Sequence, residues 1–182
     1  MDKRWRNLSV IIIIIIAIAV LLFVPIELPN DVSNGVPSQT VALESVAQKY
    51  NFSLDTLTFA DNTFDSEILV SFKTDLLSVP ESDLKELVSE KIAIMQELLT
   101  FFDKYYLMVD VMENTDAPCN DVSLVSDVKS EADLLMQRIV SFNDTLTSSY
   151  MDSDYVGFSL NETGIALSVT EEYQNLLGGE CA

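Results

Sequence analysis

The sequence of 182 residues contains no histidine. Histidine is the commonest general base in enzymes, the partner of nucleophilic serine and cysteine, and the usual protein ligand of transition metals. Its absence excludes Ser-His and Cys-His catalysis and removes the usual ligand of a transition-metal site. The sequence also lacks GxSxG, Walker A, GxGxxG and HExxH motifs. We therefore expect a protein that is not an enzyme, with no cofactor and no bound metal.

Basic residues are scarce, since 10 Lys and Arg stand against 29 Asp and Glu, for a formal net charge of -19. Only seven of the basic residues lie beyond residue 30, where 27 of the acidic residues are found. Such a surface repels nucleic-acid phosphates and anionic lipid headgroups, so we exclude nucleic-acid binding and peripheral lipid binding. Two interpretations remain: solubility in a salty exterior, which we prefer, and attraction of cations or of a basic partner.

Cysteine is limited to Cys119 and Cys181. Their separation of 62 residues excludes a CxxC redox or zinc pair, and an even number of cysteines in an oxidising compartment favours a disulfide. Free reactive thiols are the alternative. Three Asn-x-Ser/Thr triplets are candidate glycosylation sites in a host that carries out this modification, although such triplets also arise by chance. They begin at Asn51, Asn143 and Asn161.

The sequence has one long apolar run. Residues 10–24 are all apolar, and a helix over residues 8–26 is long enough to cross the hydrocarbon core of a bilayer. Basic residues precede the run and none follows until Lys49, which places the N-terminus in the cytoplasm and the rest of the chain outside the cell membrane. We predict a single-pass transmembrane helix. A cleaved signal peptide is the alternative, but bulky and charged residues follow the run where a cleavage site needs small ones.

The domain organisation follows from this predicted anchor. Residues 1–7 form a cytoplasmic tail, residues 8–26 the transmembrane anchor, and residues 27–38, which combine Pro, Gly, Asn and Ser, a linker. Residues 39–182 form one acidic extracytoplasmic domain of ordinary size. It begins with a predicted short helix over residues 39–50.

Two β-hairpins are predicted within this domain. Residues 55–60 and 66–74 are rich in β-branched and aromatic side chains and flank the turn-rich sequence ADNTFD. Residues 155–160 and 165–170 repeat the arrangement around the sequence NETG. Together the hairpins would form a four-stranded antiparallel sheet.

Between the hairpins the sequence predicts two long helices. A capping-box spacing begins at Ser78, so we expect the first helix over residues 79–113. Steps of alternately four and three residues from Leu84 meet apolar side chains at eight of nine positions, and the exception is Lys91. The second helix, over residues 121–149, is apolar at every such position. These positions are Val125, Val128, Ala132, Leu135, Ile139, Phe142 and Leu146.

The predicted fold class is therefore α+β, with a long antiparallel helical hairpin inserted between the two β-hairpins. The helices either project as a bare coiled coil or lie along the sheet in a compact domain. We favour the compact form because an isolated two-helix seam buries little surface. A disulfide from Cys119, in the turn between the helices, to Cys181 would require the C-terminal tail to run back along the helices. Such a bond would support the compact form.

Acidic loops at residues 61–67, 113–121 and 152–157 are interpreted as ordinary polar turns, because they match a calcium loop incompletely. The four aromatic side chains within residues 101–106 are expected to pack in the core. From these observations we expect a membrane-anchored protein-interaction or assembly module at the cell surface, whose partner is another protein or a second copy of the chain. The alternative is an extracytoplasmic domain that binds a small ligand or calcium.

Overall fold

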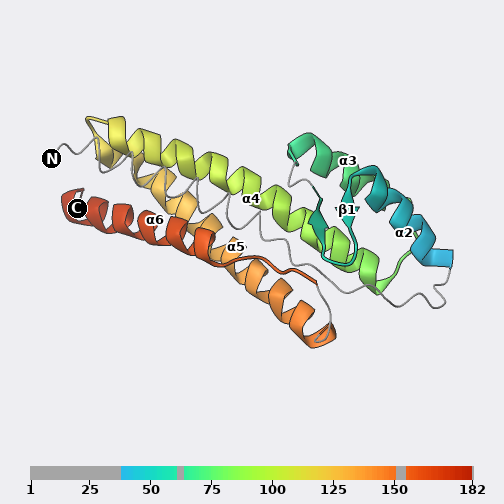
Figure 1. The fold of residues 1–182 in the computed structure, drawn as a ribbon. Coiled ribbons are helices and arrows are strands. Elements are labelled where there is room, and N and C mark those ends of the chain that lie inside the picture. The colour runs from blue at the N-terminus through green and yellow to red at the C-terminus, as the bar shows by residue number, and fades with distance from the viewer. Residues whose placement is uncertain (1–37, 61–63, 151–154, 182) are drawn as a thin grey trace.

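The computed structural model describes residues 38–60, 64–150 and 155–181, which are mostly helical (Figure 1). In chain order the elements are α2 (Ser38–Lys49), β1 (Phe52–Ser53), β2 (Thr58–Phe59), α3 (Ser66–Leu76), α4 (Asp83–Asn114), the 3₁₀ helix η1 (Pro118–Asp121), α5 (Val122–Ser149) and α6 (Asn161–Glu180). Helices α4, α5 and α6 form a bundle. The elements α2, β1, β2 and α3, called the head below, lie beside the N-terminal half of α4.

Within the described residues, no helix is both long enough and apolar enough to cross a membrane. The predicted transmembrane helix therefore has no counterpart in the described structure. The predicted anchor at residues 8–26 lies outside the described residues, together with the predicted tail at residues 1–7 and residues 27–37 of the predicted linker.

Helices α4 and α5 pack against each other as the antiparallel pair that the sequence predicts, and η1 lies in the turn between them. All seven predicted inward positions of α5 are buried. On α4 the side chains of Val88, Ile92 and Met108 have no exposed surface. The 3.5-residue apolar repeat thus identified both helices and the face of α5 that enters the core.

The start of α4 differs from the prediction. The N-cap is Ser82, whose side chain accepts a hydrogen bond from the Lys85 backbone N–H at 3.2 Å, so the helix begins four residues later than expected. Lys85 is itself buried and donates from Nζ to the Val79 carbonyl at 2.8 Å and to Glu81 at 2.6 Å. These contacts close the turn that precedes the helix.

The predicted hairpin at residues 155–160 and 165–170 is wrong, because α6 begins at Asn161 and continues through the second expected strand. The buried side chains of α6 are Thr163, Ala166, Thr170 and Leu177. Their spacing by three, four and seven residues is that of one helix face. Two of the four are threonines, and Thr170 donates its hydroxyl to the Ala166 carbonyl at 2.7 Å. The apolar pattern alone therefore hides the helical period.

The predicted strand at residues 66–74 is also wrong, because α3 occupies this range. Asp65 caps the helix by accepting a hydrogen bond from the Ile68 N–H at 2.8 Å. The buried side chains of α3 are Leu69, Phe72 and Leu76. Their spacing by three and four residues is the period of a helix and not the alternation of a strand.

The one sheet within the described residues is a two-stranded hairpin in which Phe52 pairs with Phe59 and Ser53 with Thr58. Its turn holds Leu57 at a φ of 56° with a fully buried side chain, a strained combination that the surrounding packing must maintain. The predicted four-stranded sheet, and with it the α+β fold class, is therefore wrong. The described chain is a helical bundle with a small, mainly helical head.

A disulfide joins Cys119 to Cys181, with 5.4 Å between their Cα atoms. Helix α6 runs back along the α4–α5 pair, and its C-terminal end lies beside the turn between those helices (Figure 1). The predicted pairing is confirmed, and the tail returns along the helices as this bond requires. The expected packing of the helices along a four-stranded sheet is wrong, because the described residues contain only a two-stranded sheet. The disulfide fixes the C-terminal end of α6 to the bundle.

Candidate functional site

Within the described residues, no three Asp, Glu or Cys side chains converge as a group that would hold a metal ion. Of the three acidic loops, residues 113–121 are described in full, and they form the turn that contains η1. The other two loops include residues 61–63 and 152–154, which lie outside the described residues.

The aromatic side chains of α4 contribute to packing. Phe101 and Tyr105 are buried, and the ring of Phe101 contacts the rings of Phe102 and Tyr105 at centroid distances of 5.2 and 6.1 Å. Burial, together with the nearby Tyr173 of α6, raises the pKa of Tyr105 to about 12. This hydroxyl is therefore protonated at neutral pH, and the expected core role of the cluster is confirmed for Phe101 and Tyr105.

Most basic side chains in the described residues form ion pairs with carboxylates of the same chain. Of the seven in the described residues, five form ion pairs. Arg138 of α5 makes two contacts with Glu90 of α4, at 2.7 and 2.9 Å, and a further one with Glu97. The other pairs are Lys49 with Asp75, Lys85 with Glu81, Lys104 with Glu131, and Lys129 with Asp133 and Glu171. Lys91 is buried, so the exposed charge is predominantly carboxylate.

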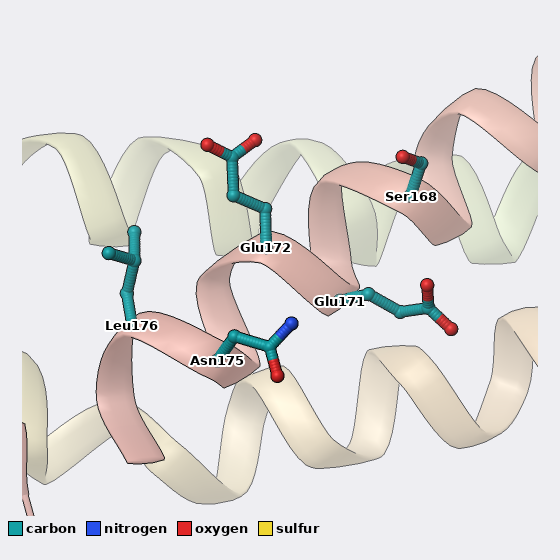
Figure 2. Close-up of a pocket in the computed structure, with 5 residues that line it drawn as sticks. All are labelled: Ser168, Glu171, Glu172, Asn175 and Leu176. Atoms are coloured by element: carbon teal, nitrogen blue, oxygen red, sulfur yellow. The ribbon is translucent and has the colours of Figure 1, made fainter. Parts of the chain in front are cut away.

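An open hollow lies on the outer face of α6 (Figure 2). Its lining residues are Ser168, Glu171, Glu172, Asn175 and Leu176. Figure 2 shows Glu172 pointing toward α4, and Glu171 lies 3.8 Å from Lys129 of α5. Leu176 is 52% exposed, and α6 contains no Lys or Arg. The hollow thus offers carboxylates for the charged end of a Lys or Arg side chain and an apolar surface for its stem.

A buried amine is the most unusual polar group of the bundle. Lys91 is 5% exposed, and its Nζ donates to the carbonyls of Val156 at 3.0 Å and Gly157 at 3.2 Å. The same nitrogen lies 3.8 Å from the ring centroid of Phe158 and 5.7 Å from that of Phe142. Burial lowers the pKa of Lys91 to about 7, although the carbonyls and ring faces favour its charged form. The sequence signal for this group was its place as the one polar residue in the apolar repeat.

Residues 155–160 cover this amine and are called the clasp below. Besides Lys91, the clasp forms hydrogen bonds to α5 and to the head. Asn143 of α5 accepts from the Phe158 N–H at 2.8 Å and donates to the Phe158 carbonyl at 2.9 Å. The Val156 N–H donates to the Thr56 carbonyl, in the hairpin turn of the head, at 3.0 Å. The clasp is therefore the point where the head, α4 and α5 meet just before α6 begins.

The three candidate glycosylation sites lie in different surroundings. Asn51 and Asn161 have exposed side chains, whereas Asn143 is half-buried and uses both atoms of its amide to bind the clasp. A Cβ atom at Gly157 would lie 2.5 Å from Asn143 Oδ1, so this approach requires glycine. Asn143 has a structural role that the triplet pattern does not reveal.

Two Ser-x-x-Lys spacings, which in some hydrolases supply a nucleophile and a nearby lysine, begin at Ser82 and Ser126. Ser82 caps α4, and the Nζ of Lys85 is bound to a carbonyl and a carboxylate. Lys129, four positions before its partner Asp133, forms an ion pair with it at 2.7 Å. Ser82, Lys85 and Lys129 thus make structural contacts, and Ser126 is an exposed residue of α5.

Comparison with known proteins identifies no relative. No family model, no curated protein and no solved structure matches the chain. Its function is therefore inferred from the charge and geometry of the chain itself.

Proposed function

We propose that this protein is a non-enzymatic interaction module that binds a basic surface of a partner protein at the outer face of a cell membrane. The observation that carries the proposal is the distribution of charge. Five of the seven basic side chains in the described residues are paired with carboxylates of the same chain, and a sixth is buried. The excess carboxylates remain at the surface for a partner of opposite charge.

Electrostatic complementarity also separates two kinds of partner. A second copy of the chain would present the same acidic surface, and like-charged surfaces placed together cost binding free energy. A protein with Lys and Arg side chains would gain attraction and faster association, both of which weaken as salt screens the charges. We therefore favour a different protein over self-association.

The outer face of α6 is the part of the surface that suits such a partner best. It combines Glu172, the exposed Leu176 and Glu171, which lies 3.8 Å from Lys129 of α5, and α6 itself contains no basic residue. The disulfide holds the C-terminal end of this helix, and the clasp lies directly before its N-terminal end. A face fixed in this way loses little conformational entropy when a partner binds.

The proposed location rests on the amino-acid sequence. The apolar run within residues 8–26 and the basic residues before it favour a chain held at the cell membrane, with the N-terminus in the cytoplasm and residues 39–182 outside. Two oxidised cysteines agree with a compartment outside the cytoplasm.

The test is mild cross-linking of C-terminally tagged full-length protein in its own membranes, followed by affinity purification and mass spectrometry. We expect one stoichiometric partner whose contact region is rich in Lys and Arg. Its affinity should fall at least tenfold between about 50 and 300 mM salt, since exposed ion pairs are screened over this range. Recovery of the protein alone, or of a partner whose binding is insensitive to salt, would contradict the proposal.

Matched variants locate the contact. The double change Glu171→Gln and Glu172→Gln removes two charges from the α6 face, whereas Glu44→Gln with Asp103→Asn removes two exposed charges elsewhere. The first pair should weaken binding of the purified partner by about tenfold, and the second should leave it within about twofold, because rim charges act mainly at short range. Equal losses would assign binding to the net charge and not to α6.

A further inference from the structure

The hydrogen bonds that hold the clasp differ in whether their partners titrate. Asn143 and Thr56 bind it through neutral hydrogen bonds, which do not change with pH. Of the described side chains that form hydrogen bonds to the clasp from other elements, only Lys91 titrates, and it binds the carbonyls of Val156 and Gly157. The charged form of this amine has no carboxylate partner, because no ion pair joins Lys91 to any described residue.

We propose that Lys91 is a protonation-dependent latch: the neutral amine keeps the clasp, and with it the start of α6, closed over the α4–α5 pair, and protonation favours opening. Opening of the clasp would expose the amine to water, where its charged form is far better solvated. The disulfide would keep the other end of α6 attached while the start of the helix moves.

Charged groups on the neighbouring elements do not replace Lys91 in this role. On α4, Glu90 is bound to Arg138. Within the clasp, the ring of Tyr155 packs on Tyr150 with 4.5 Å between the centroids. Burial, and after it Tyr150 and Asp55 of the head, raise the pKa of Tyr155, so its phenol remains protonated below pH 9. In the first turn of α6, burial raises the pKa of Glu162, whose Oε1 is buried without a hydrogen-bond partner among the described residues. Burial and this carboxylate raise the pKa of Tyr106 of α4. The α5 side chains that face Lys91, Phe142 and Asn143, do not titrate.

The pH range follows from the two states. The pKa of Lys91 is about 7 in the closed state, and its ordinary value is 10.5. The open state binds the proton more tightly between these values, so opening becomes less favourable as the pH rises from about 7 to about 10.5. Below about 7 the amine is protonated in both states and the dependence ends. The equilibrium constant for opening should be roughly 50-fold smaller at pH 9 than at pH 7.

Amide hydrogen exchange measures this opening directly. The full-length chain, with its disulfide intact and in a mild nonionic detergent, is exchanged at pH 7 and pH 9, and the rates are corrected for the intrinsic effect of pH on exchange. Peptides that cover residues 155–165 should gain protection of tens-fold at pH 9, while peptides from the middle of α5 should change much less. Equal protection of the clasp peptides at both pH values would overturn the proposal.

Three variants assign the effect. Lys91→Arg keeps a charge at both pH values and should leave the clasp weakly protected at each, and Lys91→Met should remove the pH dependence. Lys73→Met, on the exposed surface of α3, should behave as the wild type does. A pH dependence that persists in the Lys91 variants would overturn the proposal. Should these variants fail to fold, the wild-type comparison between pH 7 and pH 9 still decides it.

Discussion

Replacement of Lys91 by methionine should change the pH dependence of global stability in a defined direction. The folded state lowers the pKa of Lys91 from 10.5 to about 7, so the unfolded chain binds more protons between these values and the free energy of unfolding rises with pH. The burial penalty that results is about 4 kcal/mol at pH 7 and about 2 kcal/mol at pH 9. Methionine carries no such penalty.

Methionine also removes the two hydrogen bonds to the carbonyls of Val156 and Gly157, which costs about 1–3 kcal/mol each if the carbonyls remain unsatisfied. That loss is the same at both pH values, so it cancels when the two measurements are compared. The stability of the wild type relative to Lys91→Met should therefore increase by about 2 kcal/mol from pH 7 to pH 9. The range stops at pH 9 because tyrosines titrate above it.

The assay is urea unfolding of the full-length protein in a mild nonionic detergent, followed by the helical circular dichroism signal at both pH values. Lys73→Met serves as the control, because its side chain is exposed and its removal should not alter the pH dependence. A difference between the wild type and Lys91→Met that is the same at pH 7 and pH 9 would refute the reasoning. It would mean that the carbonyls and aromatic rings stabilise the charged amine enough to offset its burial.

Three further predictions concern other contacts. Replacement of Cys119 and Cys181 by alanine should lower the free energy of unfolding by about 4 kcal/mol, the chain-entropy value for a loop of this length, as measured by chemical denaturation with and without reductant. The change Gly157→Ala should cost about 1–3 kcal/mol because its Cβ would overlap Asn143 Oδ1, and this cost should shrink in an Asn143→Ala background when the four proteins of the double-mutant cycle are compared. In a glycosylating host, intact-mass analysis of the folded protein should find sugar on Asn161 and none on Asn143; full occupancy of Asn143 would contradict its structural role.

The long helices were predictable because their inward positions are almost all apolar. Each step of the repeat in α5, from Val125 to Leu146, meets a buried side chain. The position of Cys119 in the turn between them also allowed the disulfide to be used as a test of compactness. Lys91 interrupted the apolar repeat in α4, and this interruption marked the position of the buried amine.

The two wrong hairpins have separate physical causes. In α6 the buried face includes Thr163 and Thr170, so a count of apolar residues finds no helical period. In α3 the β-branched and aromatic composition of the segment suggested a strand. The structure is instead decided by the Asp65 cap and by the burial of Phe72 on the same helix face as Leu69 and Leu76. Tertiary packing outweighed local propensity in both segments. The clasp contacts join residues as many as 100 positions apart, which no local pattern contains.

The bond between Cys119 and Cys181 closes residues 119–181 into a covalent ring that contains α5, the clasp and α6. A single proteolytic cut anywhere within that ring divides the chain without separating its parts. The product would migrate as one molecule on a gel until a reductant is added, and α6 would remain with the bundle after the cut. A cut between α3 and α4, outside the ring, would leave no covalent link between the head and the bundle.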